Sequence, residues 1–145
     1  MPNAKNFFTK SQQEDIRQAI LNAELDTSGE IRVHIENTCT GDTLDRALIV
    51  FGKLEMEKTA SRNGVLIYLA VKNRKFAVIG DKGINDVVPE NYWDSIKNKM
   101  VNHFRENQFT EGLVEAIMET GNQLKKYFPY QTSDKNELSD EISFD

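Results

Sequence analysis

The segment Val65–Val71 constrains the fold of this chain more than any other feature, because its seven consecutive residues are all apolar. The run is much shorter than the roughly twenty residues that a membrane helix needs. It is rich in Val, Leu and Ile and follows Asn63-Gly64, a typical turn pair. These properties indicate a β-strand that is buried on both faces. Such a strand needs helices on each side of its sheet, which predicts a three-layer α/β/α sandwich.

Two further segments have the patterns of strands. Glu30–Glu36 alternates polar and apolar residues with a period of two, as in a strand with one buried face. Lys75–Gly80 follows the apolar run after a short loop, Lys72–Arg74, which predicts an antiparallel hairpin. A helix between the first two strands would make them parallel, with a right-handed crossover. The expected sheet is therefore small and mixed.

Four amphipathic helices complete the predicted order α-β-α-β-β-α-α. The first begins at a capping box, which is formed either by Thr9 with Gln12 or by Ser11 with Glu14. Each helix has apolar residues spaced three and four apart, which places them on one face. Pro89 suits the first turn of the third helix. The expected helices span about 9–25, 43–59, 89–104 and 110–128.

The length of 145 residues fits one domain, which we place at residues 9–130 after a flexible N-terminal segment, residues 1–8. Residues 131–145 contain five acids and one lysine, and therefore carry −4 of the net charge of −5. This composition predicts an acidic, disordered tail. The alternative is that Ile142 and Phe144 in the tail dock on a partner.

Charge and cysteine content argue against several classes of function. Outside the tail the chain is close to neutral and has no basic stripe, so we expect no binding to nucleic acid. Cys39 is the only cysteine, which leaves no intrachain disulfide and no cysteine-based zinc site. The chain begins with no apolar signal segment, and no run is long enough for membrane insertion. We therefore expect a cytoplasmic monomer.

Acidic residues gather in and after the loop that follows the third predicted strand. Asp81, Asp86 and Glu90 belong to this region, and Glu30 is expected at the same end of the sheet. Carboxylate and backbone oxygens are the ligands of hard cations, so Ca²⁺ or Mg²⁺ are the candidate metals. The spacing is not that of an EF-hand loop. The alternative is a solvated turn whose acids cap the helix that follows.

A second polar turn, Asn37–Asp42, follows the first predicted strand. It lies at the carboxyl end of the parallel strands, where open α/β sheets usually bind ligands. The loop Gly80–Asp86 leaves the third strand at the opposite end, so we expect that the two loops do not form one site. Cys39 lies in the turn Asn37–Asp42, but the negative charges of Asp42 and Asp45 nearby disfavour the thiolate form of its side chain. We interpret Cys39 as an incidental or structural thiol.

The remaining polar candidates are weak as catalytic or zinc sites. His34 and His103 are the only histidines and lie in different elements, so they do not predict a zinc site. Arg32, His34 and Glu36 share the polar face of the first strand. That face is either solvated or, if helices cover it, a buried polar set that needs partners.

Several of these segments, taken in order, resemble the TPM domain. This family includes thylakoid-lumen photosystem repair proteins, worm receptor auxiliary proteins and many bacterial proteins. The resemblance covers about residues 9–128, and the chain looks most like the short, stand-alone bacterial members. The matching pieces are Thr27–Val33, Ala47, Phe51, Asn63–Ile67, Arg74, Ile79-Gly80 and Gly83-Ile84.

The resemblance implies an α/β/α sandwich that acts as a regulatory or interaction module. It further implies binding of a divalent cation, no organic cofactor, and an unidentified protein partner that is membrane-associated in some relatives. The alternative is a metal-assisted acid phosphatase acting on small phosphate esters, which the likeness to plant members implies. A phosphatase needs a nucleophile or a metal-activated water. The sequence has no Cys-x5-Arg, Asp-x-Asp or Walker element, so this activity rests on the resemblance alone.

Overall fold

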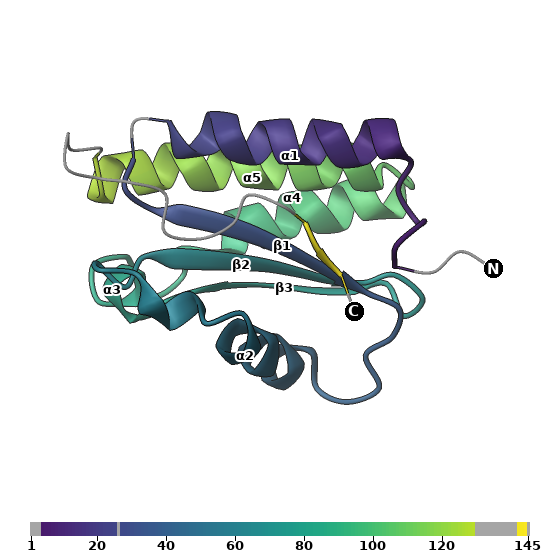
Figure 1. Cartoon of the computed structure of the whole chain (residues 1–145), viewed down its shortest axis with the longest axis horizontal. Coiled ribbons are helices and arrows are strands. Elements are labelled where there is room, and N and C mark those ends of the chain that lie inside the picture. Colours follow the sequence, from purple (N-terminus) through teal and green to yellow (C-terminus); the bar gives the residue numbers. More distant parts are fainter. Residues whose placement is uncertain (1–3, 26, 130–141, 145) are drawn as a thin grey trace.

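The computed structural model describes residues 4–25, 27–129 and 142–144. These residues form three layers, in which a β-sheet lies between helices on both of its faces (Figure 1). The α/β sandwich that the apolar run predicts is therefore confirmed.

The sheet is mixed and has the strand order β3-β2-β1-β4. Strand β2 (Gly64–Ala70) is buried along its whole length, as expected for a strand with helices on both sides. It pairs in parallel with β1 (Glu30–Glu36) and antiparallel with β3 (Lys75–Gly80). The predicted parallel pair and hairpin are both confirmed. Strand β4 (Ser143–Phe144) adds to the outer side of β1 in parallel.

The helices divide between the two faces of the sheet (Figure 1). Thr9 begins the first helix through a capping box with Gln12, which settles the choice between the two predicted registers. None of the helices in the described ranges is long and apolar enough to cross a membrane. One face carries α1 (Lys10–Glu24), α4 (Asp94–Arg105) and α5 (Phe109–Tyr127), and the other carries α2 (Thr43–Lys53).

Two helices are shorter than predicted. Helix α2 ends at Lys53, because Glu55 adopts a left-handed backbone conformation with a φ of 55°. A single turn of 3-10 helix, η1 (Met56–Lys58), follows it. Helix α4 begins at Asp94, since the segment from Pro89 forms turns before the helix starts. Local apolar spacing cannot distinguish such turns from the first turn of a helix.

Some described residues of the predicted flexible N-terminus and of the predicted tail pack on the core. Ala4 and Phe8 are buried in the core. Ile142 and Phe144 pack against the same core, which explains why a strand forms within an otherwise acidic segment. The rest of the predicted tail and the first residues lie outside the described part of the chain, at 1–3, 130–141 and 145.

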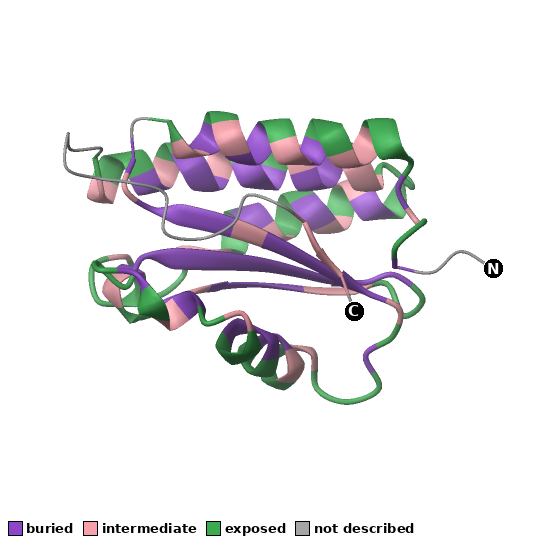
Figure 2. Ribbon diagram, in the orientation of Figure 1, coloured by how far each residue is buried: buried purple, intermediate pink, exposed green. Residues whose placement is uncertain are grey.

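The sheet separates the core into two halves (Figure 2). Val65, Ile67 and Leu69 belong to the larger half, under α1, α4 and α5. Leu66 and Tyr68 belong to the smaller half, under α2. Helix α2 packs mainly on β2 and β3, so the polar face of β1 meets only the side of this helix. The candidate site lies at that junction.

Gly121 allows α5 to pack closely against α1. A Cβ at this position would lie 2.6 Å from the Cβ and the carbonyl oxygen of Ala23. We expect Gly121→Ala to force the two helices apart and to lower the free energy of unfolding by about 1–3 kcal/mol. Urea denaturation followed by circular dichroism measures this change.

The matched control is Gly52 in α2, where an added Cβ would meet nothing within 4 Å. Gly52→Ala should raise the free energy of unfolding by up to about 1 kcal/mol, because alanine favours a helix more than glycine does. Equal stabilisation by both substitutions would contradict the close packing of α1 on α5.

Candidate functional site

A pocket of about 530 Å³ lies at the carboxyl end of the parallel strands β1 and β2. Its walls come from the end of β1, the loop 37–42 and the first turns of α2. This is the rim at which ligands usually bind to open α/β sheets. The lining includes Glu36, Cys39, Asp42, Asp45, Arg46 and Ile49.

Glu36 is the centre of the polar network beside this pocket. Its side chain is 6% exposed and accepts hydrogen bonds from Nε and Nη2 of Arg46, both at 2.8 Å. The hydroxyl of Tyr68 donates to one carboxylate oxygen, and Nε2 of His34 lies 3.2 Å from the other. Burial alone would raise the pKa of Glu36, but these three partners outweigh burial and hold the pKa at about 2. The carboxylate is therefore ionised at neutral pH.

The local sequence explains why these side chains meet. The alternation of β1 places His34 and Glu36 on one face, and the strand register puts His34 opposite Tyr68. Burial, and then the contact with Glu36, raise the pKa of Tyr68, so its hydroxyl stays protonated and donates. Arg46 reaches back from α2, and its side chain is 30% exposed. Of the two alternatives for this face of β1, the buried polar set holds for His34 and Glu36.

The β2–β3 hairpin holds the loop 37–42 in place. The backbone N–H of Cys39 donates to Oδ1 of Asn73 at 2.6 Å. Nζ of Lys75 donates to the carbonyl oxygens of Cys39 and Gly41, at 3.2 and 3.3 Å. The buried thiol of Cys39 donates to the Gly41 carbonyl oxygen at 3.6 Å. These contacts fix the loop backbone and engage the thiol, which agrees with the interpretation of Cys39 as a structural thiol.

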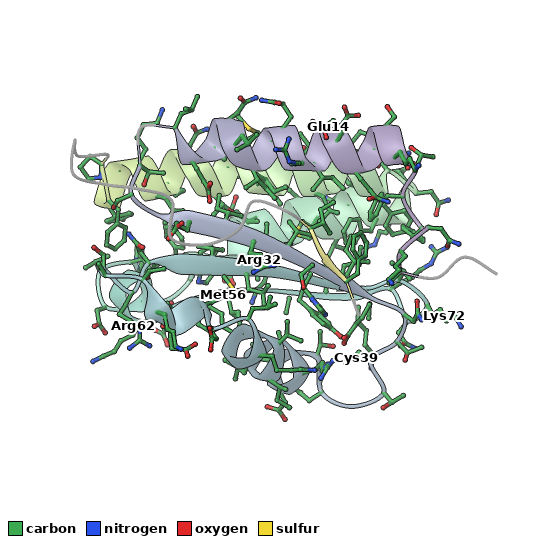
Figure 3. The ribbon with its side chains drawn as sticks, viewed as in Figure 1. Glu14, Arg32, Cys39, Met56, Arg62 and Lys72 are labelled. Carbon is green, nitrogen blue, oxygen red and sulfur yellow. The ribbon has the colours of Figure 1, made fainter. Side chains whose placement is uncertain are left out.

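The loop predicted as a metal site lies at the other end of the sheet. Ile31 pairs with Val65, and Val65 pairs with Gly80, which places the loop after β3 at the amino end of β1. Arg62 and Cys39 mark the two opposite ends (Figure 3). The two loops therefore lie at opposite ends of the sheet, as the sequence predicts.

Asp81 in this loop has structural partners. It accepts a hydrogen bond from the backbone N–H of Lys82 at 2.7 Å and so caps the short helix α3 (Lys82–Asn85). The sequence predicts a loop for these residues, and the structure shows this helix instead. Both carboxylate oxygens of Asp81 also accept from Arg62, at 2.7 and 2.8 Å. A metal ion at Asp81 would therefore have to displace a paired guanidinium.

The other predicted metal ligands are distributed around the same rim. Glu30 is buried on β1, whereas Asp86 and Glu90 are exposed. Within the described residues, no group of three or more His, Cys, Asp or Glu side chains is arranged to hold a metal ion. The assignment of a metal to Asp81, Asp86, Glu90 and Glu30 stays a prediction.

Comparison with known families identifies the family to which this domain belongs. The TPM domain family matches residues 3–129, which is most of the chain. The chain belongs to the TPM domain family. The resemblance drawn from the sequence is thereby confirmed. Among curated protein sequences, none matches this chain.

Solved structures show the same TPM architecture. The NMR structure of the BA42 protein from the psychrophilic bacterium Bizionia argentinensis is 45% identical, covers 100% of both chains and has a TM-score of 0.92. The N-terminal domain of a P. gingivalis protein is 19% identical over 83% of this chain and 78% of that one, with a TM-score of 0.67. The N-terminal domain of the cg2496 protein from Corynebacterium glutamicum is 13% identical over 90% and 82%, with a TM-score of 0.66. The last two show the fold alone.

Sequence reasoning missed two members of the polar network in this TPM domain, Arg46 and Tyr68. Tyr68 lies inside the apolar run, and its position two residues after Leu66 was the signal that it faces α2. Arg46 lies one turn after the helix cap Asp42 and beside the apolar stripe of α2. A cation at the border of such a stripe is the pattern that could have identified it.

The buried Glu36 should make the stability of the domain depend on pH. Its folded-state pKa of about 2 lies below the ordinary value of 4.5. The stabilisation is therefore complete above about pH 4.5 and is lost as the pH falls towards 2. At pH 7, Glu36→Gln should lower the free energy of unfolding by about 1–3 kcal/mol, because Arg46 loses a charged acceptor. The difference between wild type and variant should shrink through this window.

Urea denaturation at pH 7, 4 and 3 measures the difference. Glu55→Gln is the control, since the Glu55 side chain is 64% exposed and pairs only with Lys58 among the described ion pairs. A pH-independent difference between wild type and Glu36→Gln would show that the carboxylate charge is not what the network stabilises.

Proposed function

We propose that this TPM domain is a non-catalytic binding module, and that its ligand is a divalent cation in the pocket between the loop 37–42 and α2. The observation that carries the proposal is the charge of the lining. Glu36 and Arg46 neutralise each other through their paired hydrogen bonds. Asp42 and Asp45 then determine the charge of the pocket, which is negative.

The donor chemistry suits a hard, hydrated cation. Asp42 and Asp45 are exposed at the start of α2, and the lining also includes the hydroxyl residues Thr38 and Thr40. Mg²⁺ commonly binds through one or two carboxylates and keeps several of its waters, and Ca²⁺ accepts carboxylate, carbonyl and water oxygens. Six waters at about 30 Å³ each fill about 180 Å³. The pocket of about 530 Å³ can therefore hold a hydrated ion.

The groups that could perform chemistry are already engaged, which favours binding over catalysis. The Cys39 thiol donates to Gly41, and the Glu36 carboxylate has too low a pKa to act as a general acid at neutral pH. Arg46 would be the natural group for the charge of a phosphate, but Glu36 holds its guanidinium at two points. The phosphatase alternative would require this pair to separate.

The sequence-derived metal loop remains a competing location for the same ligand. It offers Asp81, Asp86 and Glu90 at one rim, with Glu30 buried nearby on β1. The contacts of Asp81 with Arg62 make this rim less accessible to a cation. Because the two loops lie at opposite ends of the sheet, one titration can separate them.

An amide NMR titration of the full chain with MgCl₂ and with CaCl₂ tests the proposal. We expect saturable shifts at residues 37–46 rather than at 81–90. Asp42→Asn keeps the helix cap, since Asn and Asp cap equally well, but removes one charge. Asp42→Asn and Asp45→Asn should each weaken binding about tenfold or more, through loss of attraction to a divalent ion.

Asp86→Asn is the matched control and should leave the affinity unchanged. Shifts confined to 81–90, together with weaker binding in Asp86→Asn, would move the metal to the loop after β3 and refute the pocket. The same samples should not hydrolyse p-nitrophenyl phosphate. Metal-dependent hydrolysis that Asp81→Ala or Asp86→Ala abolishes would establish the phosphatase instead.

A further inference from the structure

The outer edge of β1 is the second distinctive surface of the domain. Without β4, β1 would be the terminal strand of the sheet. Ile31, Val33 and Ile35 of this strand are fully buried, so the strand is apolar on the side that faces α1. The unpaired backbone groups of an apolar edge strand form a template for pairing with another extended segment. Strand addition of this kind is a common way of binding peptides.

Strand β4 protects only part of that edge. Its pairing consists of His34 with Ser143 and Ile35 with Phe144, although β1 runs from Glu30 to Glu36. No strand pairs with the rest of β1 on this side within the described residues, and the backbone N–H of Ile31 donates instead to the Glu24 carboxylate at 2.8 Å. All three residues of the segment 142–144 are only half-buried. Short, partly exposed pairings of this kind open at low free-energy cost.

The side chains of this segment alternate between two environments. Ile142 and Phe144 pack on the core beside α1, next to a small cavity of about 160 Å³ that Lys10 and Arg17 also line. The Ser143 hydroxyl lies on the other side, with its Oγ 3.0 Å from Nδ1 of His34. The edge therefore selects an apolar side chain, then a small hydroxyl side chain, then an aromatic side chain.

We infer that the outer edge of β1 is a strand-addition site for an extended peptide of this apolar–hydroxyl–aromatic pattern, and that residues 142–144 occupy it as a resident ligand. The partner is a segment of another protein that pairs in parallel with β1. It places its apolar side chains against α1 and its hydroxyl on His34. In the isolated chain, residues 142–144 cover the part of this edge at His34 and Ile35 (Figure 1). The inference is independent of whether a cation binds in the pocket.

A peptide with the sequence of residues 138–145, labelled with a fluorophore, tests the inference. The tethered segment has an effective concentration of about millimolar, so it should compete strongly with the free peptide in the wild-type chain. The full-length Phe144→Asp variant should release the edge. We expect the peptide to bind this variant about tenfold or more tightly than it binds wild type, by fluorescence anisotropy. Amide shifts at His34 and Ile35 should accompany binding.

Two controls make the outcome decisive. The Phe144→Asp version of the peptide should bind neither protein, and Phe144→Ser is a milder full-length variant if circular dichroism shows that Phe144→Asp unfolds. Equal affinity for wild type and variant would overturn the inference, as would absence of binding to both folded variants. Binding that shifts amides away from β1 would overturn it as well.

Discussion

The hydrogen-bonded, buried carboxylate of Glu36 is the interaction on which the arrangement at the carboxyl end of β1 depends. Its partners come from three elements: His34 from β1, Tyr68 from β2 and Arg46 from α2. A buried charge that loses one such partner costs several kcal/mol, so the network allows only one arrangement of these elements. The start of α2 and the loop 37–42 are positioned as a consequence. The shape of the pocket therefore follows from one carboxylate and its donors.

The two faces of the sheet differ in how much apolar surface they bury. The face under α1, α4 and α5 holds the larger core and the close contact at Gly121, and it contributes most of the apolar burial. The other face has a single long helix, α2, which packs mainly on β2 and β3. The polar side chains of β1 consequently meet the side of a helix and a loop instead of a second apolar layer. Binding groups usually occupy such loop positions on a rigid scaffold.

Local sequence patterns predicted the parts of the fold that rest on local physics. The apolar run identified β2 and, with it, helices on both faces. Alternation identified β1, and the helix between the two strands placed the turn 37–42 at the carboxyl end of the parallel pair. Strand β4 could not be predicted, because two residues within an acidic segment carry no measurable periodicity. The pairing of Arg62 with Asp81 was equally hidden, since it joins a loop residue with a φ of 51° to a helix cap nineteen positions later. Because the sequence does not reveal the guanidinium of Arg62 beside Asp81, the acids after β3 look like an open metal site in the sequence.

His34 links the two surfaces that the structure brings together. Its Nε2 faces the ionised Glu36, which can only accept, so Nε2 carries a proton. Its Nδ1 lies 3.0 Å from the hydroxyl oxygen of Ser143. The ring of His34 thus connects the Glu36 network with strand β4 at the edge of the sheet. A change at the edge that rotates this ring therefore also changes the contact between His34 and Glu36.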